Sequence, residues 1–253
     1  MMRKYLILLL IVASLIGIAA RTKAMAADYS LPGIKISVPD GEQKGRFSTA
    51  IEIVLLLTVL SLAPAILVMM TSFTRLAVVL SFLRHAIGTQ QSPPNQIIIG
   101  LALFLTFFIM TPVWKQIQTQ AITPYLADKI SQKEALNRAI KPIKKFMIHQ
   151  TRKKDLMLFV KIKDNKKPEN LESVSLSAII PAFVISELKT AFQIGFLIYL
   201  PFLVIDMVVA SVLLSMGMMM LPPVLISLPF KLMLFVLADG WYLVIDSLVK
   251  SFY

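Results

Sequence analysis

Charged side chains inside apolar segments are the residues of this sequence that most need a chemical explanation. Lys231, Asp239 and Asp246 fall in or beside the apolar stretch 224–249. A charge at the centre of a bilayer costs about 2.5–3.5 kcal/mol on insertion scales, so each should meet protein, water or an opposite charge. At 100° per residue, the two aspartates lie about 80° and 60° from Lys231, which predicts one charged helix face. We expect an intersubunit or intramolecular ion pair, with a transport pathway as the alternative.

Asp206 raises the same question one segment earlier. It is the only charged residue between Lys189 and Lys231. Carboxylates in membrane helices can relay protons, but here no partner is visible in the same segment. We therefore expect Asp206 to contact another chain.

Four methionines crowd into five positions just before the double proline Pro222-Pro223. They are Met216, Met218, Met219 and Met220. Methionine is unbranched and adapts its shape to its surroundings, so a single one usually fills a core. Four beside a helix break are equally consistent with a deformable ring that faces a pore or a partner.

The residues of enzyme sites are missing from this sequence. It has no cysteine, and its two histidines, His85 and His149, lie far apart with no metal-ligand spacing. Glycine-rich phosphate loops and nucleophile elbows are also missing. We expect no enzyme activity, no metal and no cofactor. The net charge of +12 comes without a nucleic-acid-binding module, so no nucleic-acid partner is expected.

The elements that must hold these residues are long apolar segments, which predict an all-α membrane protein. Hydrophobic residues make up 57% of the chain and charged residues 16%, against about 25% in soluble domains. We predict two broken helical hairpins, 51–114 and 181–253, on either side of a charged helical region, 115–180. The connection 71–95 inside the first hairpin is polar, and Pro222-Pro223 should separate the last two segments. Ala191 and Gly195, four positions apart, predict close helix packing.

The region 115–180 is strongly basic and is expected to hold an amphipathic helix that starts at Thr123-Pro124. A solvated charged domain explains the basicity most simply. An interaction surface for anionic lipid heads or for an acidic partner is the more specific interpretation.

The N-terminus predicts export. Arg3 and Lys4 precede an apolar run, and Ala24-Met25-Ala26 matches a small-x-small cleavage site. Residues 1–26 are thus expected to be a cleavable signal peptide, with an uncleaved membrane helix as the alternative. Residues 27–50 would form an exported segment, which would place 71–95 inside and 115–190 outside the cell membrane.

Several long motifs closely resemble the FliP family of type III secretion export gates, which has SctR relatives in injectisomes. The motifs lie at 70–75, 83–91, 93–96, 181–196 and 201–206, with the methionine cluster and Pro222-Pro223 following. The resemblance covers roughly residues 50–253 and implies a flagellar core subunit that is not an enzyme. It implies an oligomeric ring, thought to be a pentamer, that forms a channel with FliQ and FliR for unfolded flagellar subunits.

Further expectations follow from this resemblance. FlhA and FlhB should be neighbours in an inner-membrane basal body, with much of the assembly on the periplasmic side. The methionines listed above would form a gasket around the translocating chain. Six charges are expected to be buried or intersubunit, Lys231 foremost: Arg75, Glu187, Asp206, Lys231, Asp239 and Asp246. A small-solute or ion transporter subunit remains the alternative function, and a passive scaffold a third.

Overall fold

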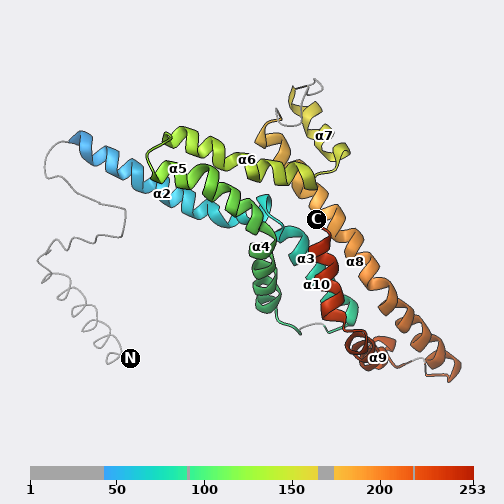
Figure 1. Cartoon of the computed structure of the whole chain (residues 1–253). Coiled ribbons are helices and arrows are strands. Elements are labelled where there is room, and N and C mark those ends of the chain that lie inside the picture. The colour runs from blue at the N-terminus through green and yellow to red at the C-terminus, as the bar shows by residue number, and fades with distance from the viewer. Residues whose placement is uncertain (1–42, 90–91, 165–173, 219) are drawn as a thin grey trace, which may run out of the picture. The chain divides into compact units, whose positions relative to one another are not determined.

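The computed structural model describes residues 43–253 with the exception of 90–91, 165–173 and 219. The predicted signal peptide 1–26 and most of the exported segment 27–50 lie outside these residues. Every regular element in the described ranges is a helix (Figure 1), which confirms the all-α class. The chain divides into two units, with the boundary between Ser61 and Leu62.

The first described helix, α2 (Gln43–Met70), belongs to the first unit up to Ser61 and to the second unit from Leu62. Pro64 lies inside it. The described apolar side chains of its first part are exposed, among them Val54 and Leu57. In the second unit, Met70 at its end packs against a buried apolar cluster.

The prediction that residues 71–95 form a polar connection is wrong over most of this range, because the range contains helix α3 (Phe73–Ile87). Apolar residues recur there every three or four positions and are buried: Leu76, Val79, Leu80, Leu83 and Ala86. This spacing forms one apolar helix face. The helix ends at Gly88, which has a φ of 89°, a left-handed conformation that glycine adopts without strain. Arg75 and Arg84 therefore lie on a packed helix and not in a loop.

The basic region is helical, but its amphipathic helix begins later than predicted. Helix α4 (Asn95–Ile117) continues through the π-helical turn η1 (Gln118–Ile122) into α5 (Thr123–Leu126), which begins at Thr123 but ends after four residues. The new start is Ser131, whose Oγ accepts a 3.3 Å hydrogen bond from the Glu134 amide as an N-cap. From there α6 (Gln132–Gln150) folds back along η1 and the end of α4 (Figure 1).

The longest described helix, α8 (Leu176–Ser215), contacts α3, α6, α7 (Lys153–Asp164) and α9 (Pro223–Leu237) of the second unit. Its 40 residues extend over about 60 Å at 1.5 Å per residue. Helix α3 packs along it, and α7 packs against it as well. Leu76, Ala191 and Leu248 belong to the cluster where α3, α4, α8 and α10 meet.

The fourth apolar segment is bent, which corrects the prediction of one continuous helix. It consists of α9 (Pro223–Leu237) and α10 (Gly240–Lys250), which meet at an angle of 64°. Asp239 at the break has a φ of 49°, in the left-handed region that interrupts a helix.

By length and composition, three helices in the described residues suffice to cross a membrane, and a fourth follows if α9 and α10 together count as one span. The three are Ile53–Met70, Asn95–Leu126 and Leu176–Ser215. The structure is thus that of a helical membrane protein.

Candidate functional site

Arg75 lies at the centre of a buried polar network. Its Nε donates to Glu187 Oε2 at 3.0 Å, and its Nη2 pairs with Oε1 of the same carboxylate. Both side chains are almost fully buried. Burying two charges is stabilising only when the geometry is good and the remaining donors are satisfied. The pair meets the first condition, because the guanidinium and the carboxylate face each other with two parallel bonds.

The remaining donors of Arg75 are satisfied by residues from two other elements. Its Nη1 donates to the carbonyl and the hydroxyl of Ser251 at 2.9 and 3.0 Å, and its Nη2 donates to Gln150 Oε1 at 2.9 Å. The guanidinium also stacks 3.8 Å from the centre of the Phe252 ring. This network therefore fixes α3 to α6, to α8 and to the C-terminal end of the chain.

Lys231 and Asp206 form a second ion pair, in which Lys231 is buried and Asp206 is partly buried. Lys231 Nζ lies 2.6 Å from Asp206 Oδ2 and donates at 3.4 Å to the Ala86 carbonyl. The hydroxyl of Ser227 donates to the other carboxylate oxygen of Asp206 at 2.5 Å. The pair connects α8 to α9 and, through Ala86, to α3. Asp206, for which a contact with another chain was expected, thus has two partners within its own chain.

The prediction that Lys231, Asp239 and Asp246 share one helix face is wrong, because the helix bends at Asp239. Only Lys231 lies on α9, where it is buried. Asp239 is exposed at the break, and Asp246 on α10 pairs with Lys250 at 2.8 Å. The sequence argument assumed an unbroken 3.6-residue repeat, which does not continue through a left-handed residue.

The methionine turn, defined here as residues 216–220, forms the tip between α8 and α9. Gly217, with a φ of 75°, ends α8 by a Schellman motif in which the amides of Met218 and Gly217 donate to the carbonyls of Leu213 and Leu214. The third apolar segment therefore ends at this glycine, before Pro222. Met216, Met218 and Met220 are 64%, 44% and 98% exposed, and Met219 lies outside the described residues.

A wholly apolar cavity of about 570 Å³ lies behind the methionine turn, between the end of α8 and the start of α9. Met216 and Met218 line it together with aliphatic residues and Phe230. The two thioethers thus have apolar space beside them into which unbranched side chains can bend.

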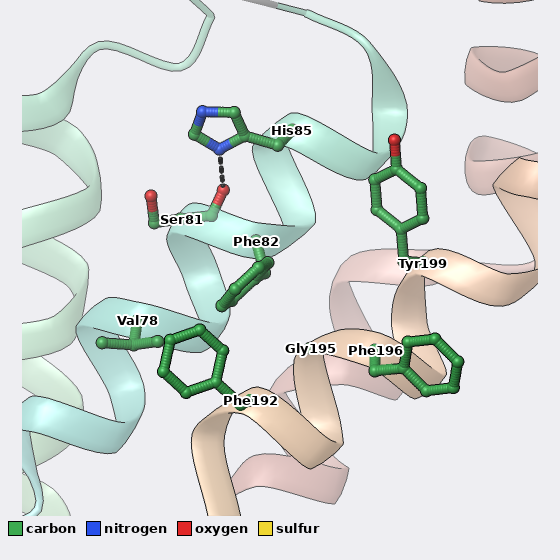
Figure 2. A pocket seen from close by; sticks show the side chains of 8 residues that line it. All are labelled: Val78, Ser81, Phe82, His85, Phe192, Gly195, Phe196 and Tyr199. Carbon is green, nitrogen blue, oxygen red and sulfur yellow. Dashed lines mark hydrogen bonds between the residues drawn. The ribbon is translucent and has the colours of Figure 1, made fainter. Parts of the chain in front are cut away.

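A second cavity, of about 720 Å³, lies between α3 and α8 (Figure 2). Its lining residues are Val78, Ser81, Phe82, His85, Phe192, Gly195, Phe196 and Tyr199. The Phe82 and Phe192 rings meet edge to face, with centroids 5.3 Å apart. His85 Nδ1 lies 2.7 Å from the Ser81 carbonyl, and because a carbonyl only accepts, Nδ1 carries the hydrogen. No acidic group lines this cavity, so the arrangement offers His85 no acid-base partner.

Gly195 is needed where α3 approaches α8, as the small-residue spacing predicted. A Cβ at this position would lie 2.7 Å from Phe82 Cδ2 and 3.0 Å from Phe82 Cβ. We predict that Gly195→Ala destabilises the protein by about 1–3 kcal/mol, because overpacking forces the ring and its helix apart. The loss is measured from the unfolding transition of the purified chain in detergent as SDS is added.

Gly100→Ala is the matched control for this substitution. Gly100 also lies inside a helix, but a Cβ there has no neighbour within 4 Å. This change should stabilise α4 by about 0.5–1 kcal/mol, because alanine restricts the unfolded chain. Equal shifts in the two variants would refute a packing role for Gly195.

Sequence reasoning missed the neutral partners of the two ion pairs. Ser227 precedes Lys231 by four residues and so lies on the same helix face, a signal that was available. Gln150, Ser251 and Phe252 approach Arg75 only in the folded chain, and no local pattern marks them. Within the described residues, no group of three or more His, Asp or Glu side chains is placed to bind a metal ion.

These features define the class of the protein: an all-α membrane protein whose apolar helices are joined by one buried and one partly buried ion pair. The family model described as "FliP family" matches residues 56–248. The flagellar biosynthetic protein FliP of Bacillus subtilis is 60% identical over 86% of this chain and 98% of its own length. Those of Pectobacterium carotovorum and Aquifex aeolicus are 52% and 53% identical, each over 88% of this chain and over 86% and 92% of their own lengths.

The chain belongs to the FliP family. It is a flagellar biosynthetic protein of the export apparatus, a structural component outside the known enzyme families. Membership implies assembly with other proteins of that apparatus and, together with the apolar helices, a membrane-associated flagellar location.

Proposed function

We propose that this chain is a core subunit of the flagellar type III protein export gate. Several copies, five in our proposal, form a ring that assembles with FliQ and FliR into a channel for unfolded flagellar subunits. The observation that carries the proposal is the methionine turn, whose three described methionines are all exposed at the tip of the α8–α9 hairpin.

The turn has the chemistry of a deformable seal. Thioether side chains are apolar, so a ring of them excludes water and ions. They are also unbranched, so they can repack around side chains of many shapes. Met216 and Met218 border the apolar cavity behind the turn, which gives them space to withdraw when a chain passes. In this proposal Met216, Met218, Met219 and Met220 form the gasket.

Two different exposed apolar faces support a ring. One lies on α4 and carries Phe104, Phe107 and Phe108, and the other lies on α8 and carries Phe196 and Leu197. If one face of a subunit packs against the other face of the next, the contact is head to tail, and repetition closes a ring when the rotation allows it. Asp239, exposed at the bend of the fourth segment, is then available for contact with a neighbouring subunit.

The proposed setting is the flagellar basal body in the bacterial inner membrane, with much of the ring on the periplasmic side and with FlhA and FlhB as neighbours. The transporter alternative is motivated by Asp206 as an isolated carboxylate and by the proline-interrupted apolar segments. Because Asp206 is bound by Lys231 and Ser227, its oxygens are occupied, and a proton relay through it has little support.

The gasket predicts the result of replacing all four methionines with alanine. The shortened side chains cannot meet across the pore, so we expect cells to leak ions and to lose export of filament protein. The leak is measured with a membrane-potential dye, and export by immunoblot of the culture medium.

Met207→Ala/Met233→Ala is the matched control, because both methionines are exposed but lie on α8 and α9 away from the turn. This variant should stay sealed and export normally. Normal export and an intact seal in the fourfold variant would refute the gasket. Loss of assembly without any leak would favour the passive scaffold instead.

A further inference from the structure

The methionine turn presents sulfur atoms of this chain to solvent. The sequence has 14 methionines and no cysteine, so thioethers are its only sulfur groups and no thiol of its own competes for an oxidant. Met220 is 98% exposed, whereas Met110 and Met147 are 1% and 0% exposed. A small oxidant in water therefore meets Met220 freely and is kept from Met110 and Met147 by the packing around them.

Exposure alone does not single out the turn, because Met207 and Met233 are also exposed in the isolated chain. Those two methionines lie within the apolar helices α8 and α9, and exposed apolar helix faces are covered by lipid or by neighbouring protein. The turn lies beyond both helices, between the Schellman motif at Gly217 and the rigid Pro222-Pro223. In the proposed gate it faces the aqueous channel, where a small hydrophilic oxidant reaches it.

A sulfoxide in the turn removes the apolar character on which a seal depends. A hydroperoxide transfers one oxygen atom to the thioether sulfur. The O–O bond breaks, the sulfur loses two electrons, and hydrogen peroxide is reduced to water. The product carries a polar S=O group, which accepts hydrogen bonds.

The cavity behind the turn makes this change incompatible with the withdrawn position of the side chains. Met216 and Met218 line that cavity, and the other side chains that line it are valine, isoleucine, leucine and phenylalanine, none of which donates a hydrogen bond. A buried acceptor without a donor is unfavourable. Oxidised side chains therefore stay in water, and the ring around a passing chain becomes polar.

We propose that the methionine turn is a reversible oxidation site, at which hydroperoxides open the seal. The proposal rests on the proposed gasket function of the same residues. Met220 reacts first, because its side chain is almost fully exposed, and Met216 and Met218 follow, because the cavity partly shields them. Methionine sulfoxide reductases with a dithiol reverse the change, since the oxygen leaves as water and the dithiol becomes a disulfide.

The first measurement maps the sulfoxides. Membrane vesicles from cells that carry the assembled export apparatus are treated with hydrogen peroxide for increasing times, and peptides of this chain are analysed by mass spectrometry. We expect Met220 to gain the mass of one oxygen atom first, and Met216 and Met218 next. Met207 and Met233 should follow only later. Oxidation of Met207 and Met233 as early as the turn would overturn the proposal, because the turn would then be no preferred site.

The second measurement follows the seal in the same vesicles by the decay of an imposed potassium diffusion potential, which does not need respiration. Peroxide should abolish the ability of the vesicles to hold this potential, and the reductases with dithiothreitol should restore it. Met216→Leu/Met218→Leu/Met220→Leu should hold the potential after the same treatment, because leucine is apolar and has no sulfur to oxidise.

Met207→Leu/Met233→Leu is the matched control, because it removes exposed thioethers away from the turn. It should leak after peroxide as the unaltered chain does. An equal leak in both leucine variants would overturn the proposal, because the damage would then lie elsewhere. Sulfoxide at the turn without any leak would also overturn it.

The untreated fourfold alanine variant separates the two proposals, because it tests the gasket without any oxidant. If that variant leaks while vesicles with an oxidised turn stay sealed, the gasket stands and the oxidation site is refuted. If the alanine variant stays sealed, the gasket is refuted and the oxidation site falls with it.

Discussion

Glu187→Leu is expected to destabilise the protein by about 3–5 kcal/mol, because it leaves the charge of Arg75 buried without a counter-charge. Arg75 is 2% exposed, so water cannot replace the lost carboxylate. The remaining hydrogen bonds to Ser251 and Gln150 are neutral and offset only part of the loss. Because Arg75 joins α3, α6, α8 and the C-terminal end, we also expect the variant to lose assembly and motility.

The stability change is measured by titrating SDS into the purified chain and following helix content by circular dichroism. Arg75→Met/Glu187→Leu should regain much of the stability, because it removes both charges and fills the space with apolar atoms. Glu134→Gln is the control, because it breaks the exposed Arg138–Glu134 pair, and exposed pairs contribute little. If Glu187→Leu and Glu134→Gln unfolded at the same SDS fraction, the Arg75 network would have no structural role.

Lys231→Met should destabilise the protein by about 3 kcal/mol, somewhat less than Glu187→Leu. The side chain of Lys231 is 3% exposed and that of Asp206 is 25% exposed, so Asp206 can recover some hydration when Lys231 is removed. Ser227 still donates to it. The connection between α8 and α9 is weakened, and this connection supports the methionine turn. We therefore expect loss of export to accompany the loss of stability.

The same SDS titration measures this variant, with two comparisons. Asp206→Asn/Lys231→Met should be more stable than Lys231→Met alone, because no buried charge is then left unpaired. Lys250→Met breaks the exposed pair with Asp246 and should leave the unfolding transition unchanged. Suppose that the stability lost in the double variant equals the sum of the losses in Lys231→Met and in Asp206→Asn. That result would show that Lys231 and Asp206 do not interact.

The elements could be predicted to the extent that each follows a local pattern. Apolar segments of sufficient length predicted the membrane helices, and the spacing of Ala191 and Gly195 predicted close packing on α8. Helix α3 was overlooked because it is short and carries Arg75 and Arg84, although most of its residues are apolar. Its apolar residues follow the helical repeat, and attention to this period would have found it.

The bend between α9 and α10 was not predicted, although the dipeptide Asp239-Gly240 at the break is typical of turns. Asp239 adopts a left-handed backbone there, next to Gly240. A Cβ at Gly240 would lie 2.2 Å from the Phe235 ring, so the close approach of that ring requires glycine. The requirement comes from a contact across the bend and is not visible in the spacing of residues along the chain.

By itself the sequence determined the helical membrane class, the resemblance to the FliP family, the methionine cluster and the list of charges that need partners. It could do so because composition and the repeat of a single helix are local properties. The tertiary structure alone decided which charges meet. Arg75 reaches Glu187 and Ser251 across 112 and 176 positions of sequence, and Lys231 meets Asp206 and not the aspartates of its own segment. Such pairs depend on which helix faces pack together, and packing is decided by the burial of all the apolar faces at once.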